Sequence, residues 1–428
     1  MTTTLKPSDA GMDEVALARL DASVQADIDA GRHFGASLLV ARGGKIVHRA
    51  NLGAVAPNRP SANDDRYLLM SMSKAFTAVL VLRAIEAGRF QLDTRVDEVL
   101  PGFGVGGKKD ATVRQLLAHT AGLPTALVPP PLPLTATGDL PGKAKAIKKL
   151  NAVYQPGTRC AYTSGTGYDA LGQILVETDP KHRSFNRIAK EDLFDPLGMH
   201  NTSFGLSTDD PKRVPVSFTP ANEAPTSSII KHIFDDCMGT DAEFPAGGAF
   251  SEIDDLLLFT EALIGRSKNG FQLLSPAMFD HARQNHTGDF NLEALQPKER
   301  FAMLRQTLGS ASISQLFAAF RAARGGQATK NKFPPFPANF TLLGGYVRGR
   351  GEYHTPAGRT ASPSAMAAVG GGSTGWLIDT DRDLTFIFLS AGFIEGLAHP
   401  KRLSRLCDLA IAAVRNSNQA GTDRYHVA

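Results

Sequence analysis

The chain has 428 residues, of which 42% are hydrophobic and 21% charged, and its net charge is +4. This length can bury a large core in one big domain or two interlocked domains, and the composition is that of an ordinary soluble globular protein. Because the net charge is small and basic residues come at most in pairs such as Lys108 and Lys109, we expect no nucleic-acid partner.

The N-terminus and the cysteines indicate a cellular compartment. The first twenty residues lack the basic start and apolar core of a signal peptide, and every apolar stretch is too short to cross a bilayer. Three cysteines (Cys160, Cys237 and Cys407) are few and odd in number, so they predict no disulfide framework. We therefore expect a cytoplasmic protein without a membrane partner, and we leave the oligomeric state open.

The first half of the chain predicts a helix, a hairpin and then further helices. Apolar residues at helical spacing over 13–31, with Gly31 as a stop, predict the first helix. Strands at 36–41 and 46–48 flank a turn and form the hairpin. A strongly apolar stretch predicts a helix over 74–87, and another begins around 112–118. Residues 124–142 contain six prolines, so we predict a loop there.

The second half predicts helices followed by strands. Helical patterns cover 167–178, 252–265 and 311–324, strand-like patterns cover 340–347, 374–379 and 384–390, and a final helix covers 400–415. Strands at both ends with helices between them predict an α/β (α+β) fold, in which an antiparallel sheet flanked by helices is formed from both termini. We place this sheet domain at 1–65 and 333–428 and an inserted, mainly helical domain at 66–332, with the active site at their interface.

A serine and a lysine three residues apart form the first candidate site. Ser71 and Lys74 lie in the run SMSK at the start of the apolar helix, so their side chains share one face. Helix N-termini favour a developing oxyanion. Serine needs an adjacent base to become a nucleophile, and a lysine whose pKa is lowered by burial can serve. On its own the motif also fits a capping serine followed by a solvated lysine.

Further motifs support the catalytic interpretation. A loop tyrosine, Tyr162, precedes the helical run at 167–178, and the short motifs LLAHTAGLP (116–124), FDPLGM (194–199) and PAGGAFS (245–251) occur in order. With SxxK, these motifs make residues 12–415 resemble the serine β-lactamase and penicillin-binding-protein superfamily. The resemblance is greatest to the class C branch, which includes family VIII carboxylesterases and transacylases.

The resemblance implies a role for each matching residue. Ser71 would be acylated, while Lys74 and Tyr162 would share its proton and pass it to the leaving group. Ser164 stands where the family usually has asparagine, and we expect it to orient Lys74 by hydrogen bonding. The oxyanion hole would use the backbone N–H groups of Ser71 and Ser373.

Two departures from the family pattern limit these assignments. One extra residue separates Tyr162 from Tyr168; matching from the other end would place Thr163 in the tyrosine position, so we keep Tyr162 and expect a local bulge. The third family motif, usually Lys-Thr-Gly, matches Gly370, Gly371 and Gly372. Without the cation that grips a substrate carboxylate, β-lactam hydrolysis is disfavoured. The three glycines would instead line the substrate site closely, although a plain turn also explains them.

Other residues fit catalysis less well. His119 is best explained as a structural core histidine. Residues 371–375 (GGSTG) match the string of a nucleophile elbow, but a strand follows them instead of a helix. His281 and His286 do not share a helical face, so we expect no metal and no cofactor. The sequence thus predicts a serine hydrolase acting on a small-molecule carboxylic ester. An amide or D-amino-acid peptide hydrolase, an acyltransferase, and a non-catalytic sensor module are its alternatives.

Overall fold

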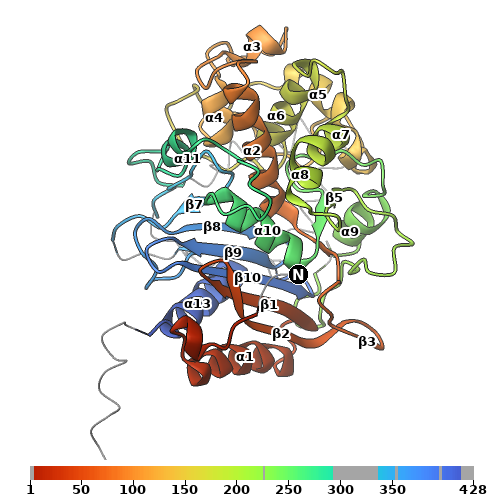
Figure 1. Cartoon of the computed structure of the whole chain (residues 1–428). Coiled ribbons are helices and arrows are strands. Elements are labelled where there is room, and N and C mark those ends of the chain that lie inside the picture. The colour runs from red at the N-terminus through yellow and green to blue at the C-terminus, as the bar shows by residue number, and fades with distance from the viewer. Residues whose placement is uncertain (1–3, 225–226, 293–335, 352–354, 395–397, 416–428) are drawn as a thin grey trace, which may run out of the picture.

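The computed structural model describes residues 4–224, 227–292, 336–351, 355–394 and 398–415. A seven-stranded antiparallel sheet in the order β3-β2-β1-β10-β9-β8-β7 forms its lower half (Figure 1). Because β1 pairs with β10 from Gly35 opposite Ala391 to Arg42 opposite Leu384, both ends of the chain share this sheet. The strands of the sheet are β1 (Gly35–Arg42), β2 (Lys45–Ala56), β3 (Arg59–Pro60), β7 (Tyr346–Val347), β8 (Met366–Gly370), β9 (Thr374–Asp379) and β10 (Leu384–Ala391).

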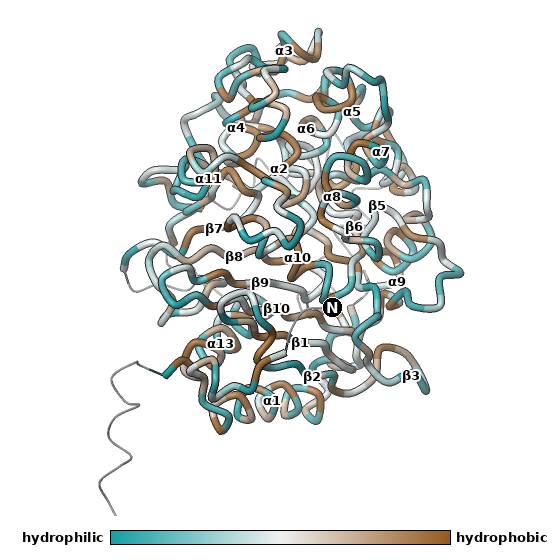
Figure 2. Tube along the Cα trace, viewed as in Figure 1, coloured by the Kyte–Doolittle hydropathy of each residue, from teal (hydrophilic) through white to brown (hydrophobic). Residues whose placement is uncertain are grey.

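Two helices cover the outer face of this sheet. Helix α1 (Glu14–Asp29) and helix α13 (Ala398–Ala412) lie below the strands in Figure 1. Asp13 caps α1, since its carboxylate accepts a hydrogen bond from the Ala16 N–H at 2.9 Å. Brown and teal turns alternate along α1 (Figure 2), as expected for a helix that buries one stripe. Its buried side includes Leu17, Leu20 and Val24, which pack in one core with residues of the sheet and of α13.

A mainly helical region covers the other face of the sheet and holds the larger core. Phe76, on the central helix of this region, makes edge-to-face contacts with Phe259 and Phe194 at centroid distances of 4.7 and 5.2 Å. The helices are α2 (Ser73–Glu86), α3 (Val96–Val99), α4 (Val113–Leu117), α5 (Leu140–Lys149), α6 (Thr166–Glu177), α7 (Phe185–Ala189), α8 (Asp195–Leu197), α9 (Ser227–Lys231), α10 (Ile253–Leu263) and α11 (Pro276–Ala282).

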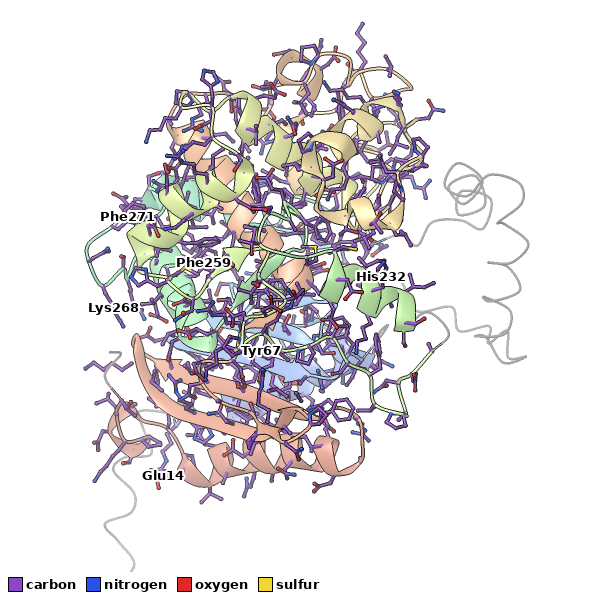
Figure 3. All side chains as sticks on the ribbon, turned by 90° about the vertical axis from the view of Figure 1, so that its right-hand side faces the viewer. Glu14, Tyr67, His232, Phe259, Lys268 and Phe271 are labelled. Atoms are coloured by element: carbon purple, nitrogen blue, oxygen red, sulfur yellow. The ribbon has the colours of Figure 1, made fainter. Side chains whose placement is uncertain are left out.

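A small second sheet joins the two halves. Strands β4 (Tyr67–Leu68), β5 (Ser203–Phe204) and β6 (Ala249–Ser251) pair in the order β4-β6-β5. Tyr67 lies where the large sheet meets the helices (Figure 3), and its hydroxyl is 3.1 Å from the Ser37 hydroxyl on β1. This junction leads directly into the segment that carries Ser71.

The predicted fold class is confirmed, whereas several element boundaries differ. The strand predicted at 340–347 shortens to Tyr346–Val347, and β8 was not predicted. Helix α5 begins at Leu140, inside the predicted loop. The helix predicted at 311–324 lies outside the described residues, and the domain boundaries stay a prediction. No helix among the described residues is both long and apolar enough to cross a membrane.

Candidate active site

Ser71 lies in a tight turn that opens helix α2. Met70 to Met72 form a 3₁₀ turn that continues into α2, so Ser71 sits at the helix start, as predicted. Met70, the preceding residue, has φ +49°, a left-handed conformation that is uncommon outside glycine. The buried Ser73 hydroxyl accepts the Ala249 N–H at 3.0 Å and ties this turn to β6. The surrounding structure therefore holds the Ser71 backbone in a restricted conformation.

The turn between β8 and β9 presses against the same segment. The Thr374 hydroxyl donates to the Leu69 carbonyl oxygen at 3.0 Å. A Cβ added at Gly370 would lie 2.0 Å from that same oxygen, so only glycine permits this approach. The hairpin thus fixes Leu69, two residues before Ser71.

Lys74 is buried, and its amine is held by two backbone carbonyls. The residue lies in the first turn of α2 and is 1% exposed. Nζ donates to the carbonyl oxygens of Ala246 at 2.8 Å and Ser164 at 2.9 Å, and it lies 3.4 Å from Ser71 Oγ. The amine also faces the rings of Tyr162 and Tyr168, at 5.1 and 5.4 Å from their centroids. Two of the three hydrogen-bonding positions of the amine are occupied by carbonyls, and the third is directed at Ser71.

Tyr162 completes the cluster from the loop before α6. Its hydroxyl is 2.7 Å from Ser71 Oγ, a short hydrogen bond. Thr163, the alternative tyrosine position, points instead to the His119 imidazole, which is 3.0 Å from its hydroxyl. The structure thus brings Ser71, Lys74 and Tyr162 together, with Tyr162 in the predicted position.

His119 secures the tyrosine loop on both sides of Tyr162. Its carbonyl oxygen accepts the Ala161 N–H at 3.1 Å, and its Nδ1 accepts the Thr163 N–H at 3.2 Å. The imidazole ring also lies beside the Tyr162 ring, with centroids 4.6 Å apart. Burial, and then the charge of Lys74, lower the pKa of His119 well below its usual range, so the imidazole is neutral and Nδ1 is free to accept. The residue is a buried structural histidine that positions the tyrosine loop.

Two predicted contacts require correction. Ser164 does contact Lys74, but through its backbone carbonyl, because its hydroxyl lies 2.9 Å from the Thr125 hydroxyl. The Ser373 N–H donates to the Gly370 carbonyl at 3.0 Å, and Ser373 is fully buried. That N–H closes the β8–β9 turn, so it is not an oxyanion donor in this structure.

The glycine run also differs from its predicted role. Gly370 and Gly372 are buried against the segment before Ser71, and only Gly371 is exposed. The three glycines therefore end β8 and form a tight turn, and Gly370 and Gly372 pack against the residues that precede Ser71. Strand β8 itself consists of Met366, three small or branched apolar residues and Gly370, so it also lacks the cation of the third family motif.

Sequence reasoning missed the groups that reach the site through their backbone. Ala246 supplies a carbonyl to Lys74 from a position 172 residues away. The motif at 245–251 was recognised, yet a backbone acceptor carries no side-chain signal. The described residues contain no group of three or more His, Cys, Asp or Glu side chains placed to hold a metal, and the absence of a metal site stays a prediction.

The antiparallel sheet, the helical region above it and the Ser71–Lys74–Tyr162 cluster between them are the architecture of serine hydrolases with a β-lactamase fold. The family model named Beta-lactamase matches residues 20–406, and the chain belongs to this family.

Individual relatives are distant. Protein flp of Staphylococcus aureus (strain N315) is 26% identical over 215 residues, which cover 49% of this chain and 43% of that protein. The chain thus spans less than half of this curated relative. EstCE1, a hydrolase with promiscuous acyltransferase activity, has a TM-score of 0.66 at 19% identity, with 92% of this chain and 99% of that chain covered. A family VIII carboxylesterase has a TM-score of 0.66 at 17% identity, with 94% of this chain and 99% of that chain covered. At these identities the two structures show a shared fold.

Proposed function

We propose that this protein hydrolyses a small-molecule carboxylic ester through an acyl-enzyme on Ser71. The observation that carries the proposal is the pair of contacts to Ser71 Oγ, from Tyr162 Oη at 2.7 Å and from Lys74 Nζ at 3.4 Å. A serine hydroxyl within reach of two groups that transfer protons is the arrangement that nucleophilic catalysis requires.

Lys74 is suited to act as the base because of its two carbonyl partners. A neutral amine has two N–H bonds, and the carbonyls of Ala246 and Ser164 accept two hydrogen bonds at 2.8 and 2.9 Å. The lone pair then points to the remaining neighbour, Ser71 Oγ.

The reaction proceeds in two balanced steps. In the first, Lys74 accepts the Ser71 proton, Oγ bonds to the ester carbonyl carbon, and the bond to the alkoxy oxygen breaks. Tyr162 donates a proton to that oxygen, so an alcohol leaves, and Lys74 restores the tyrosine proton. In the second step water attacks the acyl carbon and loses a proton to the same pair, the bond from that carbon to Ser71 Oγ breaks, and Oγ takes the proton back as the acid leaves. The Ser71 N–H at the start of α2 is the proposed oxyanion donor.

Esters are favoured over β-lactams because of strand β8. This strand has no lysine, arginine or histidine, so it offers no charge-assisted contact to a β-lactam carboxylate. The solved structures of a family VIII carboxylesterase and of EstCE1 share the fold, which agrees with ester chemistry. We further propose that the protein acts in the cytoplasm.

Turnover of short-chain p-nitrophenyl esters, measured beside D-aminoacyl amides, tests the proposal. We expect ester turnover by the full chain and its loss in Ser71→Ala, with a fluorophosphonate adduct on Ser71 detected by intact mass. Unchanged ester turnover in Ser71→Ala would exclude Ser71 as the nucleophile. Amide turnover without ester turnover would point to a peptidase, and the absence of both turnover and adduct would point to a sensor.

A further inference from the structure

A fully buried ion pair joins α5 to α6, and its aspartate is next in sequence to Tyr168, whose ring the Lys74 amine faces. Lys143 on α5 and Asp169 on α6 bring Nζ and Oδ2 to 3.0 Å, and both side chains are 0% exposed. The contact is an ion pair without the alignment of a good hydrogen bond. Buried ion pairs cost desolvation and often add no net stability. Their presence beside a site therefore calls for a reason other than stability.

Three consecutive residues connect this pair to Lys74. The Phe244 ring covers Lys143, with Nζ 4.2 Å from its centroid. The Pro245 carbonyl accepts the Thr77 hydroxyl of α2 at 2.8 Å. The Ala246 carbonyl accepts Lys74 Nζ at 2.8 Å. The aspartate of the pair is also connected to the site, because Asp169 directly follows Tyr168, whose ring lies under the Lys74 amine.

Asp169 is the acidic side chain among the titratable groups near Lys74. The titratable groups that face the Lys74 amine are Tyr168 on α6 and Tyr162 in the preceding loop. The His119 ring lies beside Tyr162, Asp169 follows Tyr168, and both interact electrostatically with Lys74. Burial raises the pKa of Tyr168 and lowers that of His119, so both are neutral near pH 7. Burial also raises the pKa of Asp169, and the charges of Lys143 and, more weakly, of Lys74 oppose that rise.

We propose that Lys143 is a positioning and charge-balancing residue for the site, because its ion pair with Asp169 neutralises the carboxylate that would otherwise hold Lys74 protonated. This inference rests on the proposed function. With Lys143 present, the buried Asp169 carboxylate has a partner of its own 3.0 Å away. Without Lys143, Asp169 would be a buried, unpaired carboxylate, and such a group favours a protonated amine nearby.

The acidic limb of the pH profile of kcat/KM tests the inference, since that limb reports the essential base of the free enzyme. In Lys143→Met we expect the limb to move to higher pH by about one pH unit, so that activity near the wild-type limb falls about tenfold and recovers in alkali. In Asp169→Asn the unbalanced Lys143 should move the limb to lower pH. The double variant should return it toward the wild-type position.

A second buried ion pair provides the control. Arg183 and Asp179 lie 2.7 Å apart with side chains 3% and 0% exposed, and Asp179→Asn should lower the thermal midpoint without moving the limb. If Lys143→Met does not fold, the positions of the acidic limb in Asp169→Asn and in the double variant test the inference instead. Unshifted limbs, or shifts of the same sign in both single variants, would overturn the inference while wild-type turnover leaves the ester proposal intact. A wild-type enzyme with no turnover and no fluorophosphonate adduct would overturn both.

Discussion

The Nδ1 atom of His119 accepts the backbone N–H of Thr163, the residue that follows Tyr162, at 3.2 Å. His119 has φ +58°, and its carbonyl oxygen accepts the N–H of Ala161. One residue in a left-handed conformation therefore fixes the chain on both sides of the tyrosine, although its imidazole makes no hydrogen bond to Ser71 or Lys74.

We expect His119→Ala to lower kcat/KM for esters by roughly 10- to 100-fold, because small displacements of a catalytic group are costly. His119→Asn should recover much of this loss, since asparagine tolerates positive φ and its side-chain oxygen can accept the Thr163 N–H. The measurement is ester turnover beside the thermal midpoint. Wild-type turnover in His119→Ala would show that Tyr162 needs no such support.

Removal of the Tyr162 hydroxyl should affect chemistry and leave folding intact. In Tyr162→Phe the ring contacts with His119 remain, while the 2.7 Å contact to Ser71 is lost. We expect ester turnover to fall by about 10²- to 10⁴-fold, the usual contribution of a proton-transferring group. Circular dichroism and the thermal midpoint serve as controls. A decrease of less than about threefold would assign the proton transfer to Lys74 alone.

The Ser164 side chain should matter little to activity. Its carbonyl oxygen accepts a hydrogen bond from Lys74, and its hydroxyl lies 2.9 Å from the Thr125 hydroxyl. We therefore expect Ser164→Ala to keep ester turnover within about threefold of wild type and to cost about 1 kcal/mol of unfolding free energy. Steady-state kinetics and urea unfolding give both numbers. A large loss of turnover at unchanged stability would return the orienting role to the hydroxyl.

The close approach of Gly370 to Leu69 offers a matched pair of glycine variants. Gly370→Ala would place a methyl group 2.0 Å from the Leu69 oxygen, whereas at Gly371 the nearest atom is 3.6 Å away, in the Met70 side chain. We expect Gly370→Ala to lower the unfolding free energy by about 1–3 kcal/mol and to reduce turnover by displacing the Ser71 turn. Gly371→Ala should resemble wild type. Equal stability of the two variants would contradict the described packing.

Asp255 on α10 should make stability fall as pH rises. Burial raises its pKa to about 6, against hydrogen bonds from Thr202 and Asn201. The folded state therefore binds more protons than the unfolded state between about pH 4 and 6, so this group lowers the unfolding free energy through that window. We expect the stability of Asp255→Asn relative to wild type to rise by up to ~3 kcal/mol between pH 4 and pH 8. A pH-independent difference would contradict the raised pKa.

Local sequence patterns predicted the parts of the site that are close in the chain. Ser71 and Lys74 share a helical face because they are three residues apart, and Tyr162 followed from the order of motifs. The contact between Gly370 and Leu69 joins segments about 300 residues apart, and it depends on backbone approach. The same reason explains why Ser373 was misassigned: its N–H is consumed by a turn that side-chain identity does not reveal. The ion pair of Lys143 and Asp169 depends on the packing of α5 on α6, and the sequence analysis predicted no helix at the position of α5.

Because Lys74 is held by two backbone carbonyls, the residues that supply them can change during evolution. Backbone oxygens are supplied by every amino acid, so residues 164 and 246 can be exchanged during evolution while the amine keeps its partners. What must persist is the path of the chain at these two places. A signature written as side-chain letters would therefore pass over the two groups that hold the Lys74 amine.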